Sequence, residues 1–273
     1  MPELPEVETV KEILKEKLVG LKIKDVTIYH DNIIAYPTVL EFKKRIVNNK
    51  ILDVERRGKF LVFVLDDYYL LSHLRMEGKY FFKKKEDVLN KHEHVLFDLD
   101  NDLQLRYMDT RKFGKMYLIL KEDILKMGPL KDLGLEPFDE KLDSNYLRSK
   151  LKNKVIPIKT ALLDQTIITG IGNIYANEIL FRAKIVPLKK ANMLNEEELS
   201  NIINYAKEVL SDSILKGGTT IHSYTAVDGV SGRFQNDLLV HGRNNLKCLV
   251  CNTEIKKIKI GGRGTYYCPS CQK

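Results

Sequence analysis

The sequence predicts an α+β protein with two domains. An N-terminal antiparallel β-sandwich with flanking helices is followed by a helical region and a small C-terminal β-hairpin. Three observations lead to this prediction. Short runs rich in β-branched and aromatic residues follow one another closely over the hundred residues after the first helix. The apolar period then becomes helical. All four cysteines lie after residue 247.

Composition and charge limit the class of protein. The 273 residues are 44% hydrophobic and 30% charged, which is typical of a folded globular chain. The net charge of +8 favours an anionic partner. The longest clean apolar run, Phe60–Leu65, is too short to cross a membrane. The start, Met1–Glu6, carries acids and prolines where a secretory signal would be basic and apolar. We therefore expect a cytoplasmic protein that makes no membrane contact.

The first expected element is a helix over Pro5–Lys17. Proline is well suited to a first helical turn, because its missing N–H has no partner there in any case. Glu6 and Glu8 suit the positive end of the helix dipole. The residues that recur at helical spacing and would face a core are Val7, Val10, Leu14 and Leu18.

Short strands are expected next, and polar turns separate them. They are Lys22–Tyr29, Phe60–Leu65, Tyr69–Leu74, Glu93–Leu99, Leu103–Met108 and Lys115–Leu120. Their close spacing favours an antiparallel sandwich over a doubly wound parallel sheet.

From about Asp123 to Lys216 the pattern is predicted to be helical. Gly128-Pro129 and the glycine and proline of segment 134–137 mark the change. An amphipathic helix is expected over Leu199–Leu215, ended by Gly217-Gly218. The predicted organisation is a β-sandwich domain over 1–130, a hinge over 131–150, a helical domain with a loop over 151–240, and a C-terminal module over 241–273.

The cysteines form the most specific local motif. Two Cys-x-x-Cys pairs, Cys248/Cys251 and Cys268/Cys271, are separated by sixteen residues. Four thiolates on two tight turns predict one structural Zn²⁺ ion with no open position for catalysis. A strand over Ile255–Ile260 would connect the pairs and make a β-hairpin zinc finger. Disulfides and an iron–sulfur cluster are the alternatives, and a reducing cytosol disfavours the disulfides.

The same module is strongly basic. Seven basic residues and one acidic residue lie between His241 and Lys273, which indicates a nucleic-acid partner or, alternatively, a solvated tail. Arg263 lies in the run Gly261-Gly262-Arg263-Gly264. Three glycines around one arginine predict a close approach of this backbone to a phosphate, although an ordinary glycine turn would look the same.

The N-terminus offers a nucleophile. Met1 precedes the small residue Pro2, so its removal would leave a secondary amine as the new chain end. An α-amino group titrates near pH 8, well below lysine, and a neutral amine can attack carbon to form an iminium adduct. Glu3 is a candidate proton shuttle, and Glu6 follows one helical turn later. A plain capped helix start is the competing interpretation.

Several blocks together resemble the bacterial formamidopyrimidine-DNA glycosylases. The quoted blocks are Pro2–Thr9, Arg57–Phe60, Ser72–Tyr80, Asp109–Gly114, Gly170–Tyr175 and Gly262–Thr265. They occur in the family's order over most of the chain. Relatives of the endonuclease VIII branch usually start Pro-Glu-Gly-Pro, so Leu4 favours the oxidised-purine branch.

The resemblance implies a fold and a set of roles. Pro2 would attack C1′ of the damaged nucleotide, Glu3 would shuttle protons, and Lys59 would lie beside the sugar and phosphate. His73 and Asn173 would bind phosphate with Arg263. Asn173 also opens a helix after Gly-x-Gly, where N–H groups face an anion, and Gly170–Ala183 would be the second half of a helix–two-turn–helix motif.

Chemistry on a nucleotide requires base eversion, and the vacated space must be filled. By resemblance, Met76, Arg111 and Phe113 would fill it as an apolar wedge, a planar cation and a stacking ring. Core packing is the alternative for Met76 and Phe113. Glu6 is included among the residues expected at the DNA, and the loop Gly217–Phe234 would cover the everted base.

The expected protein is thus a monomeric, nucleoid-associated bacterial glycosylase/lyase for 8-oxoguanine and formamidopyrimidines in duplex DNA. It would act on oxidised bases and abasic sites. Three alternatives stay open: an endonuclease VIII-like enzyme for oxidised pyrimidines, a non-catalytic zinc-finger DNA-binding protein, and an RNA-binding ribbon protein.

Overall fold

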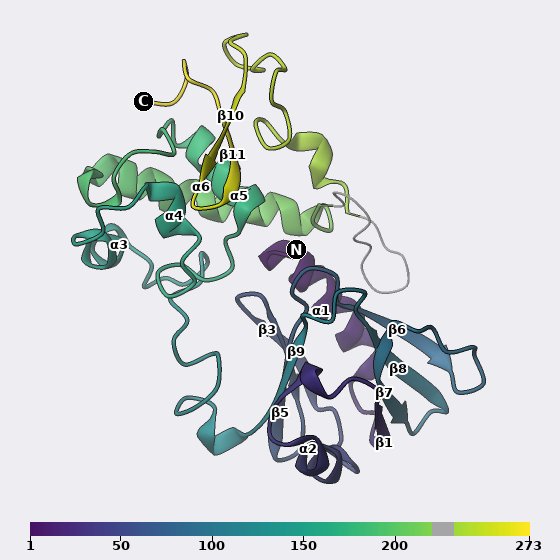
Figure 1. Ribbon diagram of the computed structural model, residues 1–273. Coiled ribbons are helices and arrows are strands. Elements are labelled where there is room, and N and C mark those ends of the chain that lie inside the picture. The colour runs from purple at the N-terminus through teal and green to yellow at the C-terminus, as the bar shows by residue number, and fades with distance from the viewer. Residues whose placement is uncertain (220–231) are drawn as a thin grey trace. The chain divides into compact units, whose positions relative to one another are not determined.

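The computed structural model describes residues 1–219 and 232–273 (Figure 1). These residues form two compact units. Unit 1 contains Met1–Lys131 together with residues 217–219 and 232–233, and unit 2 contains Asp132–Lys216 and Phe234–Lys273. Most of the loop predicted over Gly217–Phe234 lies outside the described residues.

Unit 1 begins with helix α1 (Leu4–Leu18) and contains two sheets within the described chain. The four-stranded sheet has the order β1 (Ile23–Ile28), β7 (Glu93–Leu99), β8 (Leu103–Met108), β6 (Lys79–Lys84). The five-stranded sheet has the order β2 (Ile34–Tyr36), β9 (Lys115–Leu120), β5 (Tyr68–His73), β4 (Phe60–Val64), β3 (Asp53–Arg57). Neighbouring strands are antiparallel except β2 and β9. The predicted antiparallel architecture is therefore confirmed.

One hydrophobic core joins both sheets and helix α1. The four-stranded sheet contributes Val95, Phe97 and Leu105, and the five-stranded sheet contributes Leu61, Phe63 and Leu118. The predicted apolar face of α1, Val7, Val10, Leu14 and Leu18, is buried in the same cluster. Because this face is fixed in the core, the start of the chain is held in place.

Four elements of unit 1 differ from the sequence prediction. Helix α2 (Val39–Ile46) and strands β2, β3 and β6 were not expected. Thr38 caps α2 by accepting a hydrogen bond from the Glu41 N–H at 3.3 Å, and Phe42 and Ile46 are its buried residues. A helix of two turns gives too few repeats for its period to stand out. The missed strands are short or largely charged.

Unit 2 is helical with a C-terminal hairpin (Figure 1). Its helices are α3 (Ser144–Leu151), α4 (Ile158–Leu162), α5 (Asn173–Arg182) and α6 (Glu196–Leu215), and its hairpin strands are β10 (Lys256–Ile260) and β11 (Arg263–Tyr267). The predicted amphipathic helix is confirmed as α6, which starts earlier because Asn195 and Glu198 form a capping box. Among the described residues, no helix is both long enough and apolar enough to cross a membrane.

The helical region begins later than expected. A short 3₁₀ turn covers Lys121–Asp123, and none of residues 124–143 is α-helical. The prediction of a helical pattern from Asp123 was therefore wrong for this stretch. Its glycines and prolines at positions 128, 129, 134 and 137 interrupt helical hydrogen bonding before α3 begins.

A buried carboxylate ties helix α5 to the segment that leads into the hairpin. Glu178 is fully buried, and its two oxygens accept hydrogen bonds from the backbone N–H groups of residues 239, 240 and 241 at 2.9, 3.0 and 2.8 Å. Arg182 balances its charge at 2.7 Å. Three backbone groups that would otherwise be buried without partners are thereby satisfied.

Replacing this carboxylate tests its structural role. In Glu178→Gln the amide nitrogen would face N–H donors, so we expect about 1–3 kcal/mol lower free energy of unfolding. Urea denaturation measures this. Glu197→Gln, at an exposed acid of α6, is the control and should change stability by less than about 0.5 kcal/mol. Equal small effects in both variants would contradict the role.

Candidate functional site

The start of the chain is buried and capped. Pro2 and Glu3 are buried, with Glu3 only 3% exposed. The Glu3 backbone N–H donates to Glu6 Oε2 at 2.8 Å as part of a reciprocal capping box. A chain terminus ordinarily frays, but this one is fixed by the first turn of α1. The nitrogen of Pro2 therefore has a defined position.

Glu6 binds groups of the protein itself. Its Oε1 accepts hydrogen bonds from the Thr219 N–H at 2.8 Å and the Thr219 hydroxyl at 2.9 Å. Gly218 has φ +79°, and a Cβ there would lie 2.9 Å from the same oxygen. Glu6 thus links the first turn of α1 to residues 217–219, a role that sequence reasoning missed when it grouped Glu6 with residues expected at the DNA.

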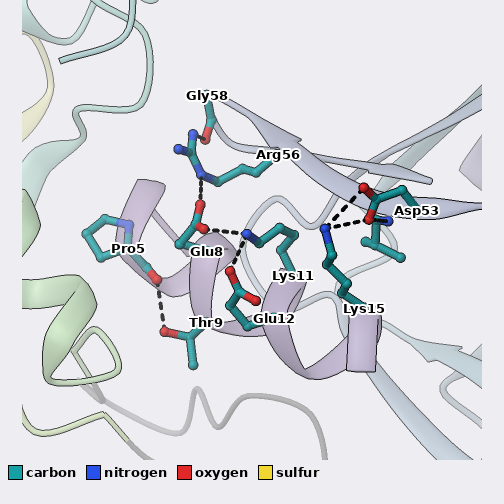
Figure 2. A network of polar contacts seen from close by, with 10 residues as sticks. Pro5, Glu8, Thr9, Lys11, Glu12, Lys15, Asp53, Arg56 and Gly58 are labelled. Carbon is teal, nitrogen blue, oxygen red and sulfur yellow. Dashed lines mark hydrogen bonds and ion pairs between the residues drawn. The ribbon is translucent and has the colours of Figure 1, made fainter. Parts of the chain in front are cut away.

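The turn that contains Lys59 is tied to α1 through a neighbouring arginine. Figure 2 shows Arg56 beside Glu8 of α1 and Gly58. The turn connects β3 to β4, and Lys59 is 6% exposed. The Arg56 guanidinium donates from Nε to Glu8 Oε2 at 2.5 Å and from Nη1 to the Gly58 carbonyl at 3.1 Å. Burial alone would raise the pKa of Glu8, but hydrogen bonds from Lys11 and Arg56 outweigh it and lower that pKa below its ordinary value. A charged bridge therefore couples the two segments.

His73 ends strand β5 directly opposite Phe60. Its Nδ1 accepts the Arg75 backbone N–H at 3.0 Å. Burial, followed by the charges of Arg75 and Lys59, lowers the pKa of His73 to about 3. The ring is therefore neutral near pH 7, and because Nδ1 accepts, Nε2 carries the proton. His73 is held as a hydrogen-bond donor.

The three predicted void-filling residues lie on two turns of unit 1. Met76 is half-buried in the turn between β5 and β6. Arg111 and Phe113 are exposed in the turn between β8 and β9, with the guanidinium carbon 4.8 Å from the centre of the Phe113 ring. Phe113 is 50% exposed, so core packing does not explain it.

In unit 2 the hairpin and the start of α5 meet at one carbonyl. Asn173 is the first residue of α5, and its Nδ2 donates to the Gly264 carbonyl at 3.2 Å. Lys159 Nζ donates to the same carbonyl at 3.0 Å and to the Thr265 hydroxyl at 2.8 Å. Arg263, the exposed first residue of β11, immediately precedes this carbonyl. Asn173 and Arg263 are thus brought together, as the prediction of a shared phosphate site requires.

Lys159 was missed by sequence reasoning. It is fully buried in α4. The only sequence signal is a lysine inside the apolar run Ile158–Leu162, and such a lysine could equally have been placed on an exposed helix face. Its ammonium group bonds Gly264 and Thr265, which lie more than a hundred positions away.

The four cysteines fit one zinc ion. Their sulfurs all lie within 4.8 Å of one another, with 3.9 Å between Cys248 and Cys271 and 3.4 Å between Cys251 and Cys268. Tetrahedral bonds of about 2.3 Å would separate ligand sulfurs by about 3.8 Å. The predicted strand between the pairs is confirmed as β10. Four thiolates close the coordination sphere, so the ion is structural.

Zinc removal should unfold the hairpin. Its buried cluster is small and consists of Phe181, Val240, Cys248, Ile255 and Cys268. Since such a cluster supplies little folding energy, the metal must supply most of it. We expect chelation under reducing conditions to release one Zn²⁺ per chain and to remove amide protection from β10 and β11, with unit 1 still folded. Hydrogen exchange measures this. Protected β10 and β11 amides after verified metal loss would refute the dependence.

The depressed pKa of His73 predicts a pH effect on stability. The folded state holds this ring neutral down to about pH 3, whereas an unfolded histidine takes a proton near pH 6.5. Because only the unfolded state takes up this proton, the free energy of unfolding falls by up to about 1.4 kcal/mol per pH unit below pH 6.5. Above pH 6.5 the contribution of His73 to stability is complete. Between pH 7 and pH 5, His73→Gln should therefore lose about 2 kcal/mol less unfolding free energy than the wild type. Urea titrations at both pH values measure this, and equal losses would contradict it.

Three family models match successive parts of the chain. Residues 1–116 match the formamidopyrimidine-DNA glycosylase N-terminal domain, and residues 133–225 match the H2TH domain of the same family. Residues 245–273 match the zinc finger found in FPG and IleRS. The chain is similar to formamidopyrimidine-DNA glycosylases of Oceanobacillus iheyensis, at 48% identity over 100% of this chain and 98% of the relative, and of Cytobacillus firmus, at 45% over all of both chains.

Solved structures give the same result. A mutant enzyme of Lactococcus lactis in complex with DNA containing Fapy-dG matches with a TM-score of 0.94 and 40% identity, covering 100% of both chains. The Lactococcus lactis enzyme with DNA containing an abasic site matches at 0.93, also with 40% identity over 100% of both chains. The domain matches, full-length relatives and shared fold establish that this chain belongs to the formamidopyrimidine-DNA glycosylase family.

Proposed function

We propose that this protein is a base-excision DNA glycosylase that removes 8-oxoguanine and formamidopyrimidines from duplex DNA and then cleaves the abasic site. One observation carries the proposal: the second residue is a proline held buried at the start of an anchored helix. Family membership supports the reaction class. A purely DNA-binding protein would have no need to fix its terminal amine.

The proposed chemistry begins at the nitrogen of Pro2 after removal of Met1. The neutral secondary amine attacks C1′ of the damaged nucleotide, the C1′–N bond to the base breaks, and an iminium forms. Glu3 protonates the sugar ring oxygen and then accepts and returns protons. The iminium acidifies the 2′ position, so both phosphates leave by β,δ-elimination and a one-nucleotide gap results.

Phosphates and the orphan base are handled by the other side chains. Lys59 supplies positive charge at the sugar and phosphate, and His73 donates from Nε2. Asn173 and Arg263 bind phosphate from unit 2. We propose that Met76, Arg111 and Phe113 enter the duplex where the damaged base leaves it. The basic finger supplies further attraction to the backbone.

We further propose that the protein acts as a monomer on the bacterial nucleoid. Segment 131–150 would act as the hinge between the sandwich and the helical domain. The loop over Gly217–Phe234 would cover the everted base, and the Glu6–Thr219 bonds at its beginning support such a role.

A second candidate substrate is an oxidised pyrimidine. A Lactococcus lactis enzyme that matches this chain with a TM-score of 0.92 was solved with DNA containing one. Leu4 favours the purine branch. Excision rates on a matched panel of 8-oxoguanine and oxidised pyrimidine duplexes would rank the two classes.

Borohydride trapping tests the nucleophile. Borohydride reduces an iminium to a stable amine, so we expect a covalent adduct with a duplex carrying 8-oxoguanine opposite cytosine, and peptide mass mapping should place it on Pro2. Pro2→Gly should lose excision by at least about a hundredfold, roughly 3 kcal/mol of barrier, and retain most of its DNA affinity.

Pro5→Gly is the matched control, because it removes a proline from the same helical turn without changing the terminal amine. It should still form the adduct. An adduct on Lys59 would keep the lyase chemistry and overturn Pro2 as nucleophile. Intact binding with no adduct on any oxidised base would favour a non-catalytic DNA-binding protein.

A further inference from the structure

The turn that carries Arg111 and Phe113 is organised around one buried carboxylate. Asp109 is fully buried at the end of β8. Its Oδ1 accepts the Arg111 backbone N–H at 3.0 Å, and its Oδ2 accepts the Gly114 N–H at 2.8 Å. The two ends of the exposed segment are therefore bonded to the same side chain. Within this segment the Arg111 guanidinium lies over the Phe113 ring.

The Asp109 backbone is fixed as well. Its N–H donates to the His92 carbonyl at 2.9 Å, and its carbonyl accepts from His94 Nε2 at 2.9 Å. Burial lowers the pKa of His94, which keeps that ring in the neutral form. The Asp109 backbone is therefore held at both its N–H and its carbonyl, which gives the carboxylate a fixed position.

Tyr107 joins this turn to the one that carries Met76. Its hydroxyl lies 3.4 Å from Asp109 Oδ2. A Cβ on Gly114 would lie 1.7 Å from the Tyr107 hydroxyl oxygen, and a Cβ on Gly78 would lie 2.3 Å from it. Both glycines therefore pack directly against the same hydroxyl, one from each turn.

Space, and not backbone conformation, requires these glycines. Neither Gly78 nor Gly114 has a positive φ, so a larger residue could adopt the local backbone. It would nevertheless displace the Tyr107 hydroxyl. Chemistry at Pro2 does not explain these two glycines, whereas close docking of the two turns does.

We infer that Asp109 and Tyr107 are positioning residues for base eversion. Asp109 sets the turn that presents Arg111 and Phe113, and the Tyr107 hydroxyl fixes it against the turn that presents Met76. This inference rests on the proposed function, in which those three side chains fill the vacated space. Insertion into a base stack works against the stacking energy, so a preordered turn has the advantage that it places the side chains without an added ordering cost.

The test compares excision from a duplex with cleavage that needs no eversion. In Asp109→Asn, one amide nitrogen faces a backbone N–H, and the turn loosens. We expect single-turnover excision of 8-oxoguanine opposite cytosine to slow about 10- to 100-fold. Cleavage of a single-stranded oligonucleotide with an abasic site, which has no base to evert and no opposite strand, should stay within about twofold. Tyr107→Phe, which removes one hydroxyl, should show the same split and serves if Asp109→Asn does not fold.

Asp98→Asn is the matched control. Asp98 lies on β7 of the same sheet and bonds Lys85 and Gln104, so it has a comparable structural role away from the turn. It should leave both reactions unchanged. Equal slowing of both reactions in Asp109→Asn and in Tyr107→Phe would show general loss of structure and overturn the inference.

A mutant cycle separates positioning from independent effects. In an Arg111→Ala/Phe113→Ala background, Asp109→Asn should slow excision by no more than a further twofold, because the side chains it positions are gone. A full multiplicative effect would overturn the inference and leave the proposed enzyme intact. Normal excision by the Arg111→Ala/Phe113→Ala variant would overturn the void-filling role and this inference, but not the Pro2 chemistry. Absence of excision and trapping in the wild type would overturn the proposed function itself.

Discussion

Burial of helix α1 is the constraint on which the rest of this structure depends. The proposed nucleophile lies at the start of the chain, and chain ends are normally the most mobile part of a domain. Here four apolar side chains fix α1 in the core shared by both sheets. The capping box of Glu3 and Glu6 holds the first turn, and the Glu8–Arg56 bridge connects the helix to the Lys59 turn (Figure 2). The hydrophobic core thus fixes the start of the chain, and with it the nitrogen that we propose as the nucleophile.

Buried polar side chains that bond the backbone recur beside several of the candidate site residues. Glu6 binds residue 219, Asp109 binds both ends of the Arg111 turn, and Glu178 binds the segment before the finger. Lys159 does the same with a carbonyl next to Arg263. These bonds satisfy backbone groups that would be costly to bury alone.

The zinc site stabilises the C-terminal hairpin. In the proposed function the hairpin presents Arg263 at a defined place, yet its own buried cluster is too small to stabilise it. Four sulfur–metal bonds replace the missing core. Contacts of the Gly264 carbonyl with Asn173 and Lys159 then set the hairpin against the start of α5. Metal binding and the proposed phosphate site therefore depend on the same hairpin within unit 2.

The sequence by itself determined the features that depend on local spacing. Helix α1, strands β7, β8 and β9, helix α6 and the four-cysteine site follow from period, turn residues and the Cys-x-x-Cys spacing. Resemblance of motifs supplied Lys59, His73, Asn173 and the void-filling residues. Helix α2 was missed because two turns give too short a period, and residues 124–143 were wrongly expected to be helical. Only the tertiary structure revealed Glu178, Lys159, Asp109 and the Glu6–Thr219 bonds. Their functions depend on partners that folding brings together, from the other end of one turn up to more than two hundred residues away. A periodicity does not record such partners, because a buried charged residue and an exposed one look the same in a sequence.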